Sequence, residues 1–470
     1  MKMYNKIIVI FLVAWFAIIM GCDVFDLDED PKHFIAPEGF YNNPDQIESV
    51  FAAVMRNTYR NWGVYGYPRG LWHNDYWDFG DLNIQRNHGA GFYTLHFANI
   101  KDLNFAIHGV KNNLVGTSGY DKLLGQAKFL RAWNYFQLVR MWGPVPLLTD
   151  DDVDDYFNLE PVNSTIPEIY ELIISDWTDA INKLPSDWGN LVGRPTSDAA
   201  KGLLAKAYIT MATAPLNDAS YYPKAAALAK EIMDAGNYSL VEDINDVFRY
   251  HNQYGPEIMW GFNANEFARS QDPRALSGIY GWGDFAVDRE WTDSYPEQPR
   301  KHIYVETMDA EGRTFHEIGR FPGVGKFLVE LSPDDIRSGI GLINVPVIRF
   351  ADVLLIFAEA TNMTNGGPTQ EAVDAVNAII DRANNYEENP NHPRVNTDMS
   401  KDEFDRAVIL ERKLELCFEG DRWFDLIRKR IIPEECREHK VVNFKEHMYL
   451  FPIPDSEFRT NPNIKQNPGY

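Results

Sequence analysis

The sequence lacks any long run of lysine and arginine. Its 45 basic residues are outnumbered by 68 acidic ones, which gives a formal charge of −23 over 470 residues. Nucleic-acid binding depends on clustered positive charge that neutralises phosphates, so this composition argues against a nucleic-acid partner. An acidic surface suits an uncharged ligand or partner and says nothing about chemistry.

Cysteine is scarce, and the motifs of metal and nucleophile sites are missing. The three cysteines are Cys22, Cys417 and Cys436, and none lies at zinc spacing or in a known nucleophile signature. Cys417 lies in the apolar stretch LELCFEG, which favours a buried thiol, and a bridge to Cys436 is left open. No HExxH motif occurs. We expect no cofactor, and a structural calcium ion at the stretch HNDYWD, residues 73–78, is the one metal left open.

No confident membrane span is present either. The apolar run from Ile7 to Met20 is short for a span, follows Lys2 and Lys6, and precedes Gly21, a pattern typical of a secretory signal. The letters IIMGC are similar to the bacterial lipoprotein cleavage box, in which the cysteine becomes the lipidated first residue.

These features predict three parts of the chain. We expect a signal peptide at 1–21, a lipidated acidic tether at 22–39 and one domain at 40–470. The tether starts at Cys22 and continues with the acidic stretch DVFDLDED. The alternative for the start of the chain is an ordinary signal peptide followed by an incidental cysteine.

Helical periodicity extends over most of the domain, and strand-like runs are few. The sequence therefore predicts a mainly α protein. The expected helices cover residues 44–61, 94–114, 120–141, 166–184, 197–213, 223–235, 349–363, 369–384, 402–417 and 420–430.

Some of these helices form pairs that follow a degenerate tetratricopeptide pattern. Ala205 and Tyr208 lie at the offsets of the first helix of such a unit, and Ala132 and Tyr135 repeat the step. Small residues are needed at these positions because the two helix backbones approach closely. The expected pairs are 197–213 with 223–235, 120–141 with 166–184, and a weaker 349–363 with 369–384.

Two stretches interrupt the helices, at about 63–93 and 237–347. Glycine, proline and aromatic residues replace the periodicity there. Long irregular inserts in a compact scaffold are commonly functional, so we expect the ligand site in these segments.

Aromatic residues of the inserts are the best candidates for binding. A sugar ring has an apolar C–H face and a rim of hydroxyls, so its site needs a flat ring flanked by hydrogen-bonding groups. The predicted ligand-binding residues are Trp72, Asn74, Asp75, Trp77, Asp78, Tyr280, Trp282, Asp284, Trp291 and Tyr295. The predicted stacking set is Trp72, Trp77, Trp282 and Trp291, and the alternative for each ring is packing beneath a loop. The helical positions of Trp133, Trp142 and Trp177 predict core packing.

Two motifs resemble catalytic or nucleotide-binding sites but lack features that such sites require. Glu411, Glu415 and Glu419 follow at i, i+4 and i+8, which resembles the carboxylates of a glycosidase. Such carboxylates flank a substrate across a cleft, which one helix face cannot do. We therefore expect a docked helix, with partners from Arg412, Arg422 and Arg428.

The second motif is the stretch GRFPGVGKF, residues 319–327, which resembles a phosphate-binding loop. Its first glycine is one residue too far from Gly325, and Phe327 stands where a magnesium-binding hydroxyl is needed. We expect Lys326 to belong to a structural segment of lysine and aromatic residues.

Six motifs in order give the chain an end-to-end resemblance to the SusD/RagB family of nutrient-binding outer-membrane lipoproteins. They are the lipobox at Cys22, GQAKFLRAWNYFQLVRMWGPVPLL, DAAKGLLAKAYITMA with AAALAKEIMDAGNY, VPVIRFADVLLIFAEA, ERKLELCFEGDRWFDLIR and FPIPDSEFRTNPNIKQNPGY. The resemblance implies a SusD-like fold with four degenerate tetratricopeptide-like helix pairs and an irregular, loop-rich half that carries the ligand. It also implies a protein without catalysis. The last motif is rich in proline and asparagine, and we expect it to run extended across the helical body.

The expected function follows from the resemblance and the aromatic inserts. We expect a lipoprotein on the outer face of the outer membrane that captures an oligosaccharide or polysaccharide and delivers it to a SusC-like TonB-dependent transporter. One alternative is a RagB-like protein that captures peptides in an acidic cleft. Another is a glycoside hydrolase on a helical scaffold.

Overall fold

The helices in the computed structural model lie where the periodicity predicts them. The structure describes residues 40–62, 89–264, 272–438 and 444–470. The long helices are α2 (Pro44–Trp62), α4 (Ala90–Asn113), α5 (Tyr120–Trp142), α6 (Ile166–Lys183), α7 (Ser197–Met211), α8 (Tyr221–Ala235), α13 (Phe350–Asn365), α14 (Gln370–Ala383) and α15 (Lys401–Glu415). The shorter α16 (Arg422–Lys429), α17 (Ile432–Glu438) and α18 (Asp455–Thr460) follow. The predicted mainly α fold is confirmed.

Local sequence signals explain where several helices begin. Thr165 forms a capping box with Glu168 at the start of α6, and Ser400 forms one with Glu403 at the start of α15. In each box the hydroxyl accepts from a backbone N–H, and the glutamate accepts from the N–H of the cap residue. These bonds satisfy donors that a helix start otherwise leaves unpaired.

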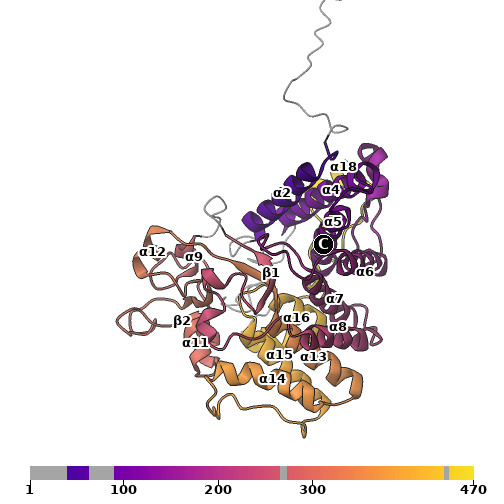
Figure 1. Ribbon diagram of the computed structural model, residues 1–470. Coiled ribbons are helices and arrows are strands. Elements are labelled where there is room, and N and C mark those ends of the chain that lie inside the picture. The colour runs from indigo at the N-terminus through magenta and orange to yellow at the C-terminus, as the bar shows by residue number, and fades with distance from the viewer. Residues whose placement is uncertain (1–39, 63–88, 265–271, 439–443) are drawn as a thin grey trace, which may run out of the picture. The chain divides into compact units, whose positions relative to one another are not determined.

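Successive helices pack side by side. The contacts run from α4 to α5, α6, α7, α8, α13 and α14 in turn (Figure 1). Small residues lie at close contacts of these helices: Ala132 and Ala205 are completely buried, and a Cβ on Gly202 of α7 would lie 2.8 Å from Cδ1 of Ile348 in the neighbouring strand segment 345–349. Because α8 contacts α13 directly, the chain between them leaves the helical stack and returns to it.

That intervening chain forms the irregular part. Strand β1 (Ile258–Phe262) pairs antiparallel with β4 (Val345–Arg349), and β2 (Val305–Glu306) pairs with β3 (Gly323–Val324). The short helices are α9 (Pro273–Leu276), α10 (Arg289–Ser294), α11 (Pro299–Tyr304) and α12 (Pro333–Ser338). The β1–β4 pair therefore joins the beginning of this insert to its end.

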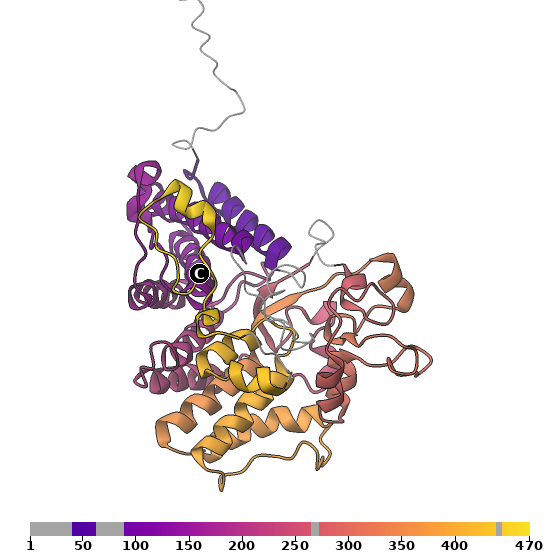
Figure 2. The same ribbon diagram turned by 180° about the vertical axis from the view of Figure 1, so that it is seen from behind.

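The carboxy-terminal segment lies against the helical body as the sequence predicts, but it is not extended throughout, because Asp455–Thr460 forms α18 (Figure 2). Phe451 N donates to Met141 O at 2.7 Å, Trp142 Nε1 donates to Pro452 O at 3.1 Å, and Asn467 Nδ2 donates to Trp142 O at 2.9 Å. These bonds attach the carboxy-terminal segment to a helix more than 300 residues earlier.

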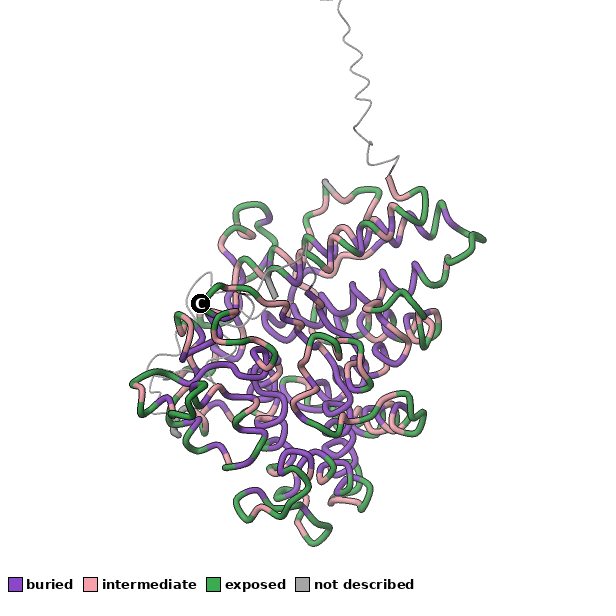
Figure 3. Tube along the Cα trace, turned by 60° about the vertical axis from the view of Figure 1, so that its left-hand side comes forward, coloured by how far each residue is buried: buried purple, intermediate pink, exposed green. Residues whose placement is uncertain are grey.

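The core runs through the centre of the helical stack, with exposed residues concentrated in loops (Figure 3). Trp133, Trp142 and Trp177 are at most 1% exposed, so their predicted core positions are confirmed. Trp133 packs edge-on against Phe262, with ring centres 5.3 Å apart. This contact docks β1 onto α5.

A cluster of buried charges joins the insert to the stack, and we call it the Glu415 cluster. Its members are Glu257, Arg300, Lys326, Arg349, Arg382, Glu411, Glu415 and Glu419. Glu415 lies 2.8 Å from Arg300, 2.8 Å from Arg349 and 2.9 Å from Arg382. Lys326 is completely buried, with its Nζ 2.9 Å from Glu419 and 3.9 Å from the ring centre of Tyr304. Its predicted structural role is confirmed.

The structure corrects the expected partners of the three glutamates. Arg412 pairs with Asp352 at 2.7 Å and Asp425 at 2.8 Å, and Arg428 pairs with Glu359 at 2.6 Å. Arg422 pairs with Glu435. Arg412 therefore ties α13 and α16 to α15, Arg428 ties α16 to α13, and Arg422 ties α16 to α17. The three glutamates instead pair with residues outside this set, such as Arg300 and Arg349.

We expect the protein to lose stability as acid protonates these carboxylates. Burial alone would raise the pKa of Glu415, but Arg349, Arg382 and Arg300 more than offset it and hold this pKa well below the ordinary 4.5. The unfolded chain therefore takes up a proton first. The contribution is fully present above about pH 4.5 and is lost as the pH falls below that value. Thermal melting followed by circular dichroism at pH 7, 5, 4 and 3 checks this, and an unchanged melting temperature between pH 5 and 3 would contradict it.

Removal of the central carboxylate should be costly. We expect Glu415→Ala to lower the free energy of unfolding by about 3–5 kcal/mol, because it leaves buried arginines without their partner. Urea unfolding measures the change. The control is Asp381→Ala, whose partner Arg394 is 68% exposed and whose loss should cost at most about 1 kcal/mol. An equal decrease in the free energy of unfolding in the two variants would refute the larger contribution of the buried cluster to stability.

Candidate functional site

Half of the predicted binding residues cannot be placed. Trp72, Asn74, Asp75, Trp77 and Asp78 lie outside the described residues, as do the predicted lipidation site Cys22 and the segment considered for calcium. Their predicted roles stay predictions.

Trp291 and Tyr295 belong to the core, which corrects their assignment to a binding surface. Each is 3% exposed, and their rings pack edge-on with centres 5.3 Å apart. Trp291 also packs against Phe418, and Tyr295 donates its hydroxyl to Leu414 O at 3.0 Å. The physical reason is that α10 docks against the segment after α15, a contact that local sequence does not reveal.

Trp282 does reach the surface, beside Tyr280 and Asp284. Its side chain is 61% exposed, and the guanidinium of Arg274 lies 4.3 Å from the centre of its ring. Asp284 is exposed, and Tyr280 is half-buried, with its hydroxyl accepting a bond from Ala310 N. Trp282 therefore remains available for stacking.

Two polar side chains, Glu306 and Arg320, hold the turn that carries Tyr280 and Trp282. The carboxylate of Glu306 accepts from Ser277 Oγ at 2.7 Å and from Ile279 N at 3.1 Å, and burial raises the pKa of Glu306 to about 7. Arg320 donates to Gly278 O at 3.0 Å and to Gly281 O at 2.7 Å. The exposed ring is thus presented from a firmly bonded turn.

The described residues also form a groove that sequence reasoning missed. It consists of two adjoining hollows of about 370 and 500 Å³, sizes typical of ligand pockets. Both are lined by the loop 192–194, Tyr254 and Asn263. The first hollow adds residues of segments 186–189, 196, 237–238 and 253–261, and the second adds α2 and α5 residues.

The loop between α6 and α7 forms one wall of the groove. Trp188 Nε1 donates to Pro195 O at 2.8 Å, which closes the loop on itself. The guanidinium of Arg194 lies 5.1 Å from the ring centre of Trp188, and Arg194 also forms an ion pair with Glu48 on α2. The loop therefore connects the first hollow to the second.

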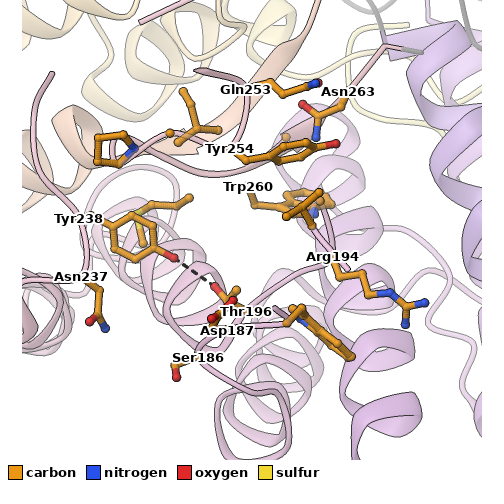
Figure 4. A pocket seen from close by; sticks show the side chains of 18 of the residues that line it. Ser186, Asp187, Arg194, Thr196, Asn237, Tyr238, Gln253, Tyr254, Trp260 and Asn263 are labelled. Carbon is orange, nitrogen blue, oxygen red and sulfur yellow. Dashed lines mark hydrogen bonds between the residues drawn. The ribbon is translucent and has the colours of Figure 1, made fainter. Parts of the chain in front are cut away.

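Tyr254 lies where the hollows meet. Its side chain is 45% exposed, and its hydroxyl lies 3.2 Å from the position of a Cβ built on Gly193. Gly193 has φ +85°, a conformation that other residues rarely adopt. Figure 4 shows Tyr254 and Asn263 on one side of the first hollow and Asp187 with Thr196 on the opposite side, where the Tyr238 hydroxyl lies 3.3 Å from Thr196 Oγ1.

The groove is aromatic, rich in amides and nearly neutral. Only Asp187, Arg194 and Glu48 carry formal charge among the described residues that line the two hollows, and the last two neutralise each other. The remaining polar groups are amides and hydroxyls, including Asn263 and Thr196. Such a surface suits an uncharged, hydroxyl-bearing ligand that stacks on rings.

Trp188 and Tyr254, which were not among the predicted site residues, lie in the kind of irregular segment that indicates a site. Trp188 lies between Pro185 and Pro195 in a glycine-containing loop, and Tyr254 precedes Gly255 and Pro256. Aromatic rings in irregular segments between helices fit the same criterion as the chosen candidates. The meeting of these two segments depends on tertiary packing and was not visible in the sequence.

Within the four described ranges, no group of three or more His, Cys, Asp or Glu is arranged to hold a metal ion. None of the helices in those ranges is long and apolar enough to cross a membrane.

Gly193 provides a structural test of the groove. We expect Gly193→Ala to lower the free energy of unfolding by about 1–2 kcal/mol, because alanine is strained at this φ and its Cβ crowds Tyr254. The control is Gly91→Ala in α4, where a Cβ meets nothing within 4 Å and stability should not fall. Urea unfolding compares the two, and an unchanged stability in Gly193→Ala would refute the strain.

Comparisons with known proteins identify the family. Residues 235–470 match the profile of the SusD family, and residues 46–209 match a second profile described as starch-binding associating with outer membrane. A SusD-like protein P2 of Formosa agariphila is 25% identical, with full coverage of both chains.

Solved structures share the fold. A SusD homolog from Bacteroides thetaiotaomicron gives a TM-score of 0.77 at 20% identity, covering 92% of this chain and 98% of that one. Surface glycan-binding protein A from Bacteroides uniformis gives 0.73 at 19% identity, covering 90% and 99%. The chain belongs to the SusD family.

Proposed function

We propose that this protein is a cell-surface lipoprotein that binds a glycan without chemical change and delivers it to a SusC-like TonB-dependent transporter. The observation that carries the proposal is the nearly neutral groove around Tyr254, lined by aromatic rings, amides and hydroxyls. Rings stack on the C–H faces of sugars, and amides and hydroxyls bond to the hydroxyl rim. The starch-binding profile and the glycan-binding neighbour support the same ligand class.

The position of the carboxylates favours binding over hydrolysis. A glycosidase places two carboxyl groups on opposite sides of the bond that it cleaves. Glu411 and Glu415 are at most 1% exposed and engaged with arginines or histidine. Among the described groove residues, Glu48 pairs with Arg194, which leaves Asp187 without a second acid.

The charge of the groove favours a glycan over a basic peptide. Capture of basic peptides would need an acidic cleft, and this groove carries two acids and one arginine. Among the described residues, the other acidic side chains do not line the two hollows. An uncharged glycan is therefore the better ligand.

The remaining parts of the proposal concern location and further contacts. The pattern before Cys22 supports a lipid anchor, and the acidic tether supports display on the outer face of the outer membrane. Exposed Trp282 with Tyr280 and Asp284 would supply an additional stacking surface. The first-insert residues Trp72, Asn74, Asp75, Trp77 and Asp78 keep their proposed binding roles.

Isothermal titration with starch, laminarin, mannan, xylan, alginate and a peptide pool tests the ligand class. We expect binding of at least one neutral glycan and no binding of the peptides. Tyr254→Ala should weaken the binding about tenfold through loss of stacking, whereas Tyr254→Phe, which keeps the ring, should stay within about threefold.

The control is Tyr386→Ala, which removes an exposed tyrosine that is 60% accessible and does not line the groove. Its affinity should match that of the unchanged protein. Peptide binding alone, or a full-affinity Tyr254→Ala variant, would contradict the proposal. Release of reducing sugar from any polysaccharide would contradict the absence of catalysis.

A further inference from the structure

Glu306 lies where the β2–β3 pair meets the turn 277–283. Its carboxylate accepts from Ser277 Oγ at 2.7 Å and from Ile279 N at 3.1 Å, both in the turn. Gly323 is its partner across the strand pair, and a Cβ on Gly323 would clash with Oε2 of Glu306. The carboxylate is thus enclosed by the turn on one side and by the backbone of β3 on the other.

The same turn determines the position of the exposed ring of Trp282. Trp282 N donates to Arg274 O at 2.6 Å, which fixes the backbone of the turn against α9. Ser277 Oγ, which donates to Glu306, also accepts from Tyr280 N at 2.8 Å. The bonds to Glu306 therefore bear on how firmly Trp282 is presented.

Arg320 brings positive charge to Glu306. Its guanidinium donates to Gly278 O at 3.0 Å and to Gly281 O at 2.7 Å, within the turn. Further charged or titratable groups in the packed elements have partners of their own. They are Asp309 and Glu311 with Arg313 after β2, Lys326 with Glu419 after β3, His302 with Glu297, His316 with Asp293, and Tyr280, whose hydroxyl accepts from Ala310 N.

Ionisation of Glu306 is coupled to closure of the turn. Burial raises the pKa of Glu306 to about 7, because it outweighs the hydrogen bonds from the turn and the positive charge of Arg320. A glutamate released into water has the ordinary pKa of 4.5, so the turn takes up a proton from solvent when it closes. The cost of ionising the closed turn is absent below about pH 4.5, grows as the pH rises and is complete above about pH 7.

We propose that Glu306 is a pH-sensitive latch for the turn 277–283. In a mildly acidic medium the turn stays closed around the neutral acid, and in an alkaline medium it opens more often because the carboxylate is ionised. Trp282 is 61% exposed, so its ring is the part of the turn that a ligand or partner would meet. The latch makes the presentation of this ring depend on pH, whatever the groove binds.

The test is hydrogen exchange of the full chain at pH 5.5 and 8.0, followed by mass spectrometry of peptides that cover the turn. After correction for the intrinsic pH dependence of exchange, we expect the protection of these amides to fall about tenfold or more from the lower pH to the higher one. In Glu306→Gln, which keeps an acceptor oxygen but cannot ionise, protection should change by less than about threefold. Arg320→Gln should move the midpoint of the change to a higher pH, because it removes a favourable cation.

The matched control is Glu311→Gln, the same substitution at a glutamate whose side chain is 67% exposed. It should keep the pH dependence of the unchanged protein. The comparison also separates Glu306 from His302 and His316, because histidines titrate in the same range and both are retained in every variant.

Equal protection of the turn at both pH values in the unchanged protein would overturn the inference, as would greater protection at pH 8.0. A pH dependence that persists in Glu306→Gln would assign it to another group and would also overturn the latch. If Glu306→Gln does not fold, ¹³C NMR of the unchanged protein labelled at its glutamate carboxyls decides the matter. A carboxyl that titrates near pH 7 supports the latch, and the absence of any that titrates above about pH 6 refutes it.

Discussion

The pairing of buried charge at Glu415 is the constraint on which the rest of the structure depends. One carboxylate contacts arginines from α11, β4 and α14, elements that are distant from one another in the sequence. A charge removed from water without a partner is very unfavourable, so these elements must come together for any of them to be buried. Arg349 continues the pairing to Glu257, directly before β1. The same residues that close the core thus set the position of β1, whose Trp260 lines the first hollow.

The sequence predicted the helices well because their signals are local. Apolar spacing, capping residues and small residues at crossings all act within one or two turns, and Ala132, Ala205 and Thr165 behave as those signals indicate. The burial of Trp291 could not be predicted from the local sequence. Its surroundings look like an exposed loop, but Phe418 covers it from more than a hundred residues away. The true partners of Glu411 and Glu419 were hidden for the same reason.

The groove could not be predicted from the sequence, because its walls come from distant segments that only tertiary packing brings together. These segments are α2, the loop before α7 and the segment around Tyr254, and no short motif joins them. The groove has the kind of surface that the sequence predicts for a site, with rings beside amides and hydroxyls, but it is formed by other residues. Trp282 retains the exposure that such a role needs, while Tyr254 and Trp188 carry the same chemistry at positions that were not singled out. Composition therefore indicates which kinds of side chain a site would use, and packing decides which aromatic residues lie beside a hollow.

The β1–β4 pair has a consequence for how this architecture diversifies. Because the two strands are adjacent, the chain leaves the helical stack and returns to it at nearly the same place. Turns between the strands, such as the one bearing Trp282, can be lengthened, shortened or exchanged while α8 stays against α13. Changes in these turns would alter the surface around Trp282 at little cost to folding, provided that Arg300 and Lys326 keep their places. The architecture thus separates a charge-paired core, which must stay fixed, from surface turns that can vary.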